Sequence, residues 1–143
     1  MPTSTFYKFD KFVLNKGKKV FNLATDQLKI ALTNTAPTKA TDNQYSDIVS
    51  PVATTNMVGT TAALDITTTS FTQTSGTSKL ILVDLTVVAS GAVGPFQYAV
   101  LYDDTATNKE LIGYYDYASS ITLAAADTFK VDFDGSAGVI TEA

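Results

Sequence analysis

The last third of the chain decides the fold, and residues 95–140 read PFQYAVLYDDTATNKELIGYYDYASSITLAAADTFKVDFDGSAGVI. Apolar and polar side chains alternate in three parts of this stretch, as they do when successive side chains of a strand point to opposite faces. The polar run between the first two parts is rich in Asp, Asn and Thr, which favour turns. We therefore predict antiparallel strands at residues 96–102, 111–117 and 128–133, with a short strand at 121–123.

Aromatic side chains dominate the first predicted hairpin. With a strict period of two, Phe96, Tyr98, Val100 and Tyr102 share one face of its first strand. Gly113 lies on the returning strand opposite aromatic residues, and a glycine at such a position leaves room for a ring.

The upstream chain supplies further strands. Residues 28–33 alternate between apolar and polar, and residues 62–73 are rich in threonine, whose β-branched side chain favours strands. Residues 79–88 are almost continuously apolar, which predicts a strand covered on both faces. Asp84 interrupts this run and is expected at a bulge or near the edge of the covered region, because an unpaired buried carboxylate is costly.

Residues 6–14 have the pattern of a short amphipathic helix. Phe6, Phe9, Phe12 and Val13 recur at spacings of three and four, with charged residues between them. A helix this short is not stable alone. Its phenylalanines must therefore be buried either in the domain's own core or on another subunit.

The whole pattern predicts a single β-rich domain over residues 1–143, with a basic, aromatic segment at 1–19 and a β body at 20–143. Six to eight short strands with evenly spaced turns indicate an antiparallel β-sandwich or a jelly-roll-like barrel. Residues 38–61 are polar and form a long loop with one short helix near 42–49. Loops of this length often contact partners.

Composition argues against most catalytic chemistry. The chain contains no cysteine, histidine, tryptophan or arginine, so it has no disulfide, no thiolate metal site and no imidazole to act as a base near neutral pH. A serine nucleophile would have to be activated by lysine, and no glycine-bracketed elbow surrounds any serine. We expect no enzyme and no cofactor.

Several acidic and aromatic groups nevertheless need an explanation. Asp103 and Asp104 could hold calcium, and residues 132–135 (DFDG) resemble the opening of a calcium loop, but turn formation explains both. Glu110 and Asp116 could face each other as glycosidase carboxylates do. The dense tyrosine group of the hairpin fits core packing, a subunit contact or a carbohydrate contact.

Charge is unevenly distributed along the chain. Residues 1–19 carry five lysines and one aspartate, and the remainder carries five lysines and thirteen carboxylates. The basic start is either a solvated surface or a surface that docks on an acidic partner. The acidic body argues against nucleic acid, and no segment is long and apolar enough to cross a membrane. The residues that we predict to bind a partner are aromatic and lysine side chains: Phe6, Phe9, Lys11, Phe12, Lys16, Lys18, Lys19 and Tyr45.

Three segments carry a family resemblance: residues 26–37 (DQLKIALTNTAP), 100–117 (VLYDDTATNKELIGYYDY) and 120–138 (SITLAAADTFKVDFDGSAG). Together with the aromatic and basic start, they resemble a group of small virion proteins of tailed bacteriophages. Proteins of this kind are often capsid decoration, or cement, proteins, which are β-rich, frequently trimeric, and bridge neighbouring capsomers. Others belong to tails or fibres.

The resemblance implies a non-enzymatic virion structural protein, made in the host bacterial cytoplasm and seated on the outer capsid surface. The implied partners are the major capsid protein and further copies of the chain, with a trimer favoured. The alternative is a tail or fibre protein with a carbohydrate- or receptor-binding face that contains Tyr114, Tyr115 and Tyr117. In both cases the N-terminal segment and the 38–61 loop are the expected contact regions.

Overall fold

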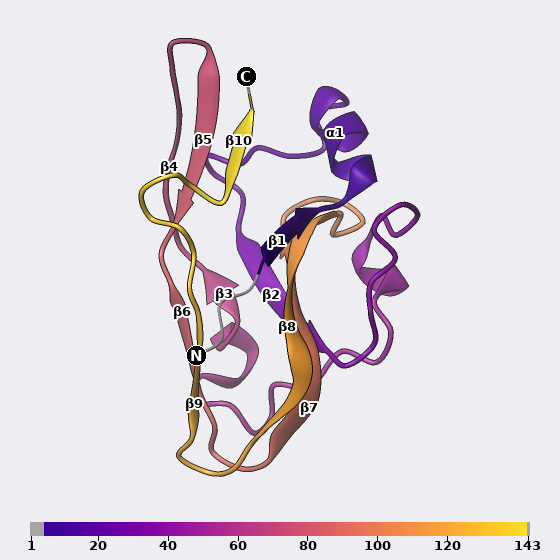
Figure 1. Cartoon of the computed structure of the whole chain (residues 1–143), viewed down its shortest axis with the longest axis vertical. Helices are drawn as coiled ribbons and strands as arrows, with labels where there is room; N and C mark the ends of the chain where they lie inside the picture. Colours follow the sequence, from indigo (N-terminus) through magenta and orange to yellow (C-terminus); the bar gives the residue numbers. More distant parts are fainter. Residues whose placement is uncertain (1–4, 143) are drawn as a thin grey trace.

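The computed structural model describes residues 5–142 and is mainly antiparallel β (Figure 1). Three open sheets have the strand orders β1-β8-β7-β2-β3, β10-β5-β4 and β6-β9. The predicted β class is confirmed, and no sheet of the described part closes into a barrel. The elements, including two short 3-10 helices (η), are β1 (Thr5–Lys8), α1 (Asp10–Gly17), β2 (Leu28–Thr33), η1 (Tyr45–Asp47), η2 (Thr60–Ala62), β3 (Asp65–Ile66), β4 (Thr68–Thr74), β5 (Thr77–Leu82), β6 (Leu85–Val88), β7 (Val93–Asp103), β8 (Leu111–Leu123), β9 (Thr128–Val131) and β10 (Ile140–Glu142).

The hairpin of β7 and β8 is the centre of the large sheet. β7 pairs with β8 on one side and with β2 on the other, and β8 also pairs with β1. β8 runs on to Leu123, so the short strand predicted at 121–123 is its end and not a separate element.

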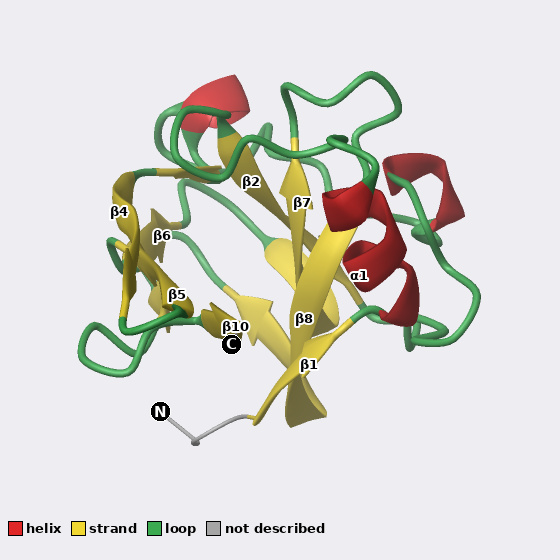
Figure 2. Cartoon of the chain, turned by 90° about the horizontal axis from the view of Figure 1, so that it is seen from above, coloured by secondary structure: helices red, strands yellow, loops and turns green. Residues whose placement is uncertain are grey.

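The main core lies between the large sheet and the two smaller sheets, which form the opposite layer (Figure 2). Aromatic rings connect the layers. The ring centroid of Phe129 on β9 lies 4.9 Å from that of Phe96 on β7 and 5.0 Å from that of Tyr117 on β8, both in edge-to-face geometry. Edge-to-face pairs add to the stabilisation that burial itself gives.

A second, smaller core covers the outer face of the large sheet. Its buried members are Phe9, Ala31, Ile48, Val100, Tyr102 and Leu111. The η1 segment of the predicted 38–61 loop lies over this face, and the ring of Tyr45 packs 4.9 Å from that of Tyr102. Both faces of the large sheet are therefore covered, and the long loop covers part of the outer face.

The helix predicted at residues 6–14 is wrong at its start. Residues 5–8 form β1, which pairs with β8 so that Phe6 lies opposite Tyr115. The backbone N–H of Phe9 donates to the carbonyl of Ile112 at 3.1 Å, and α1 begins only after it. Aromatic residues spaced by three fit a helix locally, but the free edge of β8 offers the backbone a ladder that the sequence pattern does not show.

The strand predicted at residues 79–88 is interrupted. It consists of β5 and β6, and the break falls at Val83 and Asp84. Asp84 accepts a hydrogen bond from the backbone N–H of Phe133 at 2.9 Å and pairs with Lys130 at 3.3 Å. The carboxylate thus has partners where the strand ends, as its expected edge position requires.

The predicted aromatic face of β7 is also corrected. Phe96 belongs to the main core, whereas Val100 and Tyr102 belong to the second core on the other face. Between the pairs Phe96–Ile121 and Tyr98–Asp116, β7 advances by two residues and β8 by five. This irregularity breaks the strict period of two on which the prediction depended.

Candidate partner-binding surface

The N-terminal segment presents its lysines and buries most of its phenylalanine surface. Phe9 and Phe12 are 0 % exposed, and Phe6 is half-buried against the ring of Tyr115 at 5.0 Å. The phenylalanines thus pack in the domain's own core, one of the two alternatives that the sequence left open. The prediction that Phe9 and Phe12 contact a partner is wrong, because neither side chain is exposed to solvent.

The lysines divide into two groups. Lys8 and Lys16 both pair with Glu142 of β10, at 2.9 and 3.5 Å, and so connect the segment to the three-stranded sheet. Within residues 5–142, Lys11, Lys18 and Lys19 have no carboxylate within 4.0 Å. These three are the charges of the segment that remain available to a partner.

Replacing Glu142 with glutamine is expected to lower the free energy of unfolding by less than about 1 kcal/mol, because the ion pairs that it loses are partly exposed. The hydrogen bond from Lys8 lowers the pKa of Glu142. The stability that these ion pairs contribute is therefore present at neutral pH and is lost as the pH falls through that lowered pKa. Urea unfolding at low and high salt measures it. A loss above 2 kcal/mol that persists at high salt would contradict the assignment.

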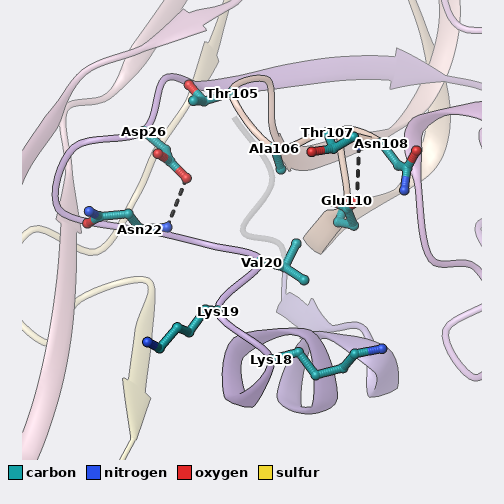
Figure 3. Close-up of a pocket in the computed structure, with 10 residues that line it drawn as sticks. All are labelled: Lys18, Lys19, Val20, Asn22, Asp26, Thr105, Ala106, Thr107, Asn108 and Glu110. Carbon is teal, nitrogen blue, oxygen red and sulfur yellow. Dashed lines mark hydrogen bonds between the residues drawn. The ribbon is translucent and has the colours of Figure 1, made fainter.

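A cavity of about 490 Å³ opens at the C-terminal end of α1 (Figure 3). Lys18 and Lys19 lie on one side of it, and the loop between β7 and β8 lies on the other. Figure 3 shows the two lysine side chains extending in opposite directions along the rim. Asp26 and Glu110 also line the cavity, so its lining carries charges of both signs. Among the described residues, the positive charges of this lining without an ion pair are those of Lys18 and Lys19 at the rim.

Beneath this loop lies a carboxyl pair that the sequence pattern did not predict, in which Asp103 is buried and Asp26 is half-buried. Asp103 is 0 % exposed, and its Oδ1 accepts hydrogen bonds from the backbone N–H groups of Thr105 and Ala106 at 2.9 and 3.1 Å. Burial, together with a hydrogen bond to the Asp26 carboxyl, raises the pKa of Asp103 to about 7. Its buried Oδ2 accepts no hydrogen bond from the described residues. A proton held by Asp103 can be donated to the Asp26 carboxyl, and this contact favours the neutral form of Asp103.

The other candidate acids are structural. Asp134 accepts hydrogen bonds from the backbone N–H groups of Ser136 and Ala137, which lower its pKa, and Asp104 pairs with Lys109 at 2.6 Å. No cluster of three potential metal ligands occurs in residues 5–142.

The proposed pairing of Glu110 and Asp116 does not hold. Glu110 is buried just before β8, and Asp116 lies six residues further along the chain. At about 3.3 Å per residue this places them roughly 20 Å apart. Glycosidase carboxylates need to lie within about 10 Å of each other.

The tyrosines do not form an exposed platform. Tyr115 and Tyr117 are 6 % and 4 % exposed in the main core, and burial raises the pKa of Tyr115. Tyr114 is half-buried between Tyr7, Phe9 and Tyr98. The rings assigned to a carbohydrate site are therefore occupied by packing, and a sugar would find little ring surface there.

Comparison with known proteins found no matching family model, no matching curated protein and no matching solved structure. In the part of the chain that the structure describes, no helix has the length and apolar character to cross a membrane.

Proposed function

We propose that this chain is a non-enzymatic structural protein of a tailed bacteriophage particle, and that it decorates the outer capsid surface by bridging neighbouring copies of the major capsid protein. The resemblance of three segments to small virion proteins supports this proposal. These segments contain β2, most of the β7–β8 hairpin and β9. We also infer that the two layers of strands form a β-sandwich, since a stiff framework covered on both faces suits a protein that holds others in place.

The observation that carries the proposal is the unpaired positive charge at the end of α1. Lys18 and Lys19 lie at the rim of an open cavity and have no carboxylate within 4.0 Å among the described residues, whereas Lys8 and Lys16 share the carboxylate of Glu142. A charged rim accelerates docking on a surface of opposite sign and selects against surfaces of the same sign. An acidic patch of the capsid is the partner that fits this rim.

Replacing both Lys18 and Lys19 with glutamine is expected to weaken binding to capsids by at least about tenfold. Capsids of the phage that encodes the chain, assembled without it, provide the assay, and co-sedimentation at several salt concentrations measures the affinity. The variant should lose most of the salt dependence together with the affinity.

The matched control is Ala124→Glu with Ala125→Glu, which changes the net charge by the same amount. These alanines are exposed in the β8–β9 turn, at the opposite end of the molecule from α1 (Figure 1). Equal weakening by both pairs would overturn the role of the rim. A reconstruction of the particle that shows the chain on the tail and not on the shell would overturn the decoration function itself.

A further inference from the structure

Exposed apolar side chains gather on one side of the molecule. Within residues 5–142, six large apolar side chains are exposed. Four of them belong to β1, to α1 and to the residues just after η1: Tyr7 (39 %), Val13 (51 %), Leu14 (60 %) and Val49 (55 %). Single exposed apolar residues are ordinary, but a group of them marks a contact surface.

The elements that carry these side chains are packed side by side. The backbone N–H of Asp10 donates to the carbonyl of Lys39 at 3.1 Å, and the Asn15 side chain donates to that of Asn43 at 2.7 Å. Figures 1 and 2 show α1 and η1 adjacent on the same side of the large sheet. We call the surface formed by residues 7–14 and 38–49 the α1–η1 face.

Two hollows mark this face. One, of about 500 Å³, is lined by Tyr7, Val13 and Lys39 among others, and a smaller one of about 170 Å³ is lined by Thr38, Asp42, Asp47 and Val49 among others. Residues 38 and 39 are consecutive and line one hollow each, so the chain passes directly from one hollow to the other. The face is therefore indented at two places.

Charges of opposite sign lie on the two halves of the face. On the α1 half, Lys11 stands one turn before Leu14 and has no carboxylate within 4.0 Å among the described residues. On the η1 half, Asp42 and Asp47 form no ion pair with any lysine of residues 5–142. Between them, Asp10 and Lys39 neutralise each other at 2.5 Å.

We propose that the α1–η1 face binds a second copy of this chain through a twofold contact. A twofold axis brings the α1 half of one copy onto the η1 half of the other, and does so twice. Lys11 of each copy then meets Asp42 and Asp47 of its partner, while Val13 and Leu14 cover Val49. A partner of one charge sign would complement only half of the face, so a second copy fits it better than an acidic or a basic protein.

The twofold contact differs from the trimer that the family resemblance implies, because a trimer needs two different surfaces to meet. It also uses Lys11 and leaves Lys18 and Lys19 free at the rim of the cavity. Pairing of copies and docking on a capsid can therefore occur together. The inference rests on the α1–η1 face alone and not on the proposed function.

A pair of cysteines tests the contact, because the chain has no natural cysteine. Leu14→Cys combined with Val49→Cys in one chain is expected to give a disulfide-linked dimer when the purified protein is oxidised at micromolar concentration, because the contact places residue 14 of one copy against residue 49 of the other. Leu14→Cys combined with Val58→Cys is the matched control, since Val58 is exposed to a similar extent (60 %) as Val49 (55 %) but lies outside the face. The control is expected to remain mostly monomeric under the same conditions.

Two measurements on chains without cysteine complete the test. Sedimentation velocity should show a dimer for the wild type, and Lys11→Glu should weaken it by at least about tenfold. Carbodiimide coupling of mixed ¹⁴N and ¹⁵N copies should link Lys11 to Asp42 or Asp47 of a different copy. Equal cross-linking of both cysteine variants, or a wild type that stays monomeric at several hundred micromolar, would overturn the inference. Since no capsid is present, either result leaves the decoration function untouched.

Discussion

Gly113→Ala is expected to destabilise the fold by about 3 kcal/mol and to detach β1 from β8. A Cβ at Gly113 would overlap the ring of Phe6 and lie 2.7 Å from the carbonyl oxygen of Tyr7. The ring can rotate away, but the carbonyl belongs to the backbone of β1. The strand must therefore move, and it takes with it the packing of Phe9 and the start of α1. Equilibrium urea unfolding, together with amide exchange in β1, measures the effect.

Gly135→Ala is the matched control, because no atom lies within 4 Å of a Cβ at that position. It should change the free energy of unfolding by no more than about 0.5 kcal/mol. Adding Phe6→Ala to Gly113→Ala should restore little stability, since the clash with the Tyr7 carbonyl remains. Full protection of the β1 amides in Gly113→Ala would contradict the expected detachment.

Asp103→Asn is expected to change how stability depends on pH. The pKa of Asp103 is about 7 in the folded chain and about 3.9 in an unfolded one. The folded state therefore binds the extra proton, and the stability that this group contributes is complete below about pH 4 and is lost as the pH rises through 7. The loss amounts to at most roughly 1.4 kcal/mol per pH unit. Asparagine does not ionise, so the free energy of unfolding of the variant should rise steadily relative to that of the wild type from pH 4 to 7.

The geometry allows this substitution. The asparagine oxygen can keep the bonds from the N–H groups of Thr105 and Ala106, and its NH2 group can donate to Asp26. Asp26→Asn provides the companion measurement, because it removes the carboxyl partner but leaves Asp103 buried. It should reduce the pH dependence without abolishing it. Parallel stability curves for the wild type and Asp103→Asn would show that Asp103 ionises normally in the folded state.

The strands were predictable where apolar and polar residues alternate along the sequence. β2 and the β7–β8 hairpin show this alternation, although both faces of their sheet are covered, and Gly113 does leave room for the ring of Phe6 as its position suggested. β1 was not predictable, because its conformation depends on an edge of β8 that is formed about 100 residues later. The break at Asp84 was only partly visible, since the sequence shows the charge but not the backbone donor at Phe133.

The candidate surface was also predictable only where it depends on neighbouring residues in the sequence. The excess of lysine at the start of the chain was evident, but which lysines remain free depends on Glu142 at the other end. Asp103 looked like an ordinary turn residue. It is buried because residues 26–27 lie against its loop, where the N–H of Gln27 donates to the Thr105 hydroxyl at 2.8 Å. No local pattern relates these two segments.

The pairing of β1 with β8 also has a consequence for synthesis. β8 begins about 100 residues after β1, and ribosomes add about 5 to 20 residues per second, so β1 and α1 wait roughly 5 to 20 seconds for their partner strand. During that time Phe6, Phe9 and Phe12 have no sheet to cover them. The nascent chain is then most open to aggregation or to capture by a chaperone, and slower translation lengthens that interval.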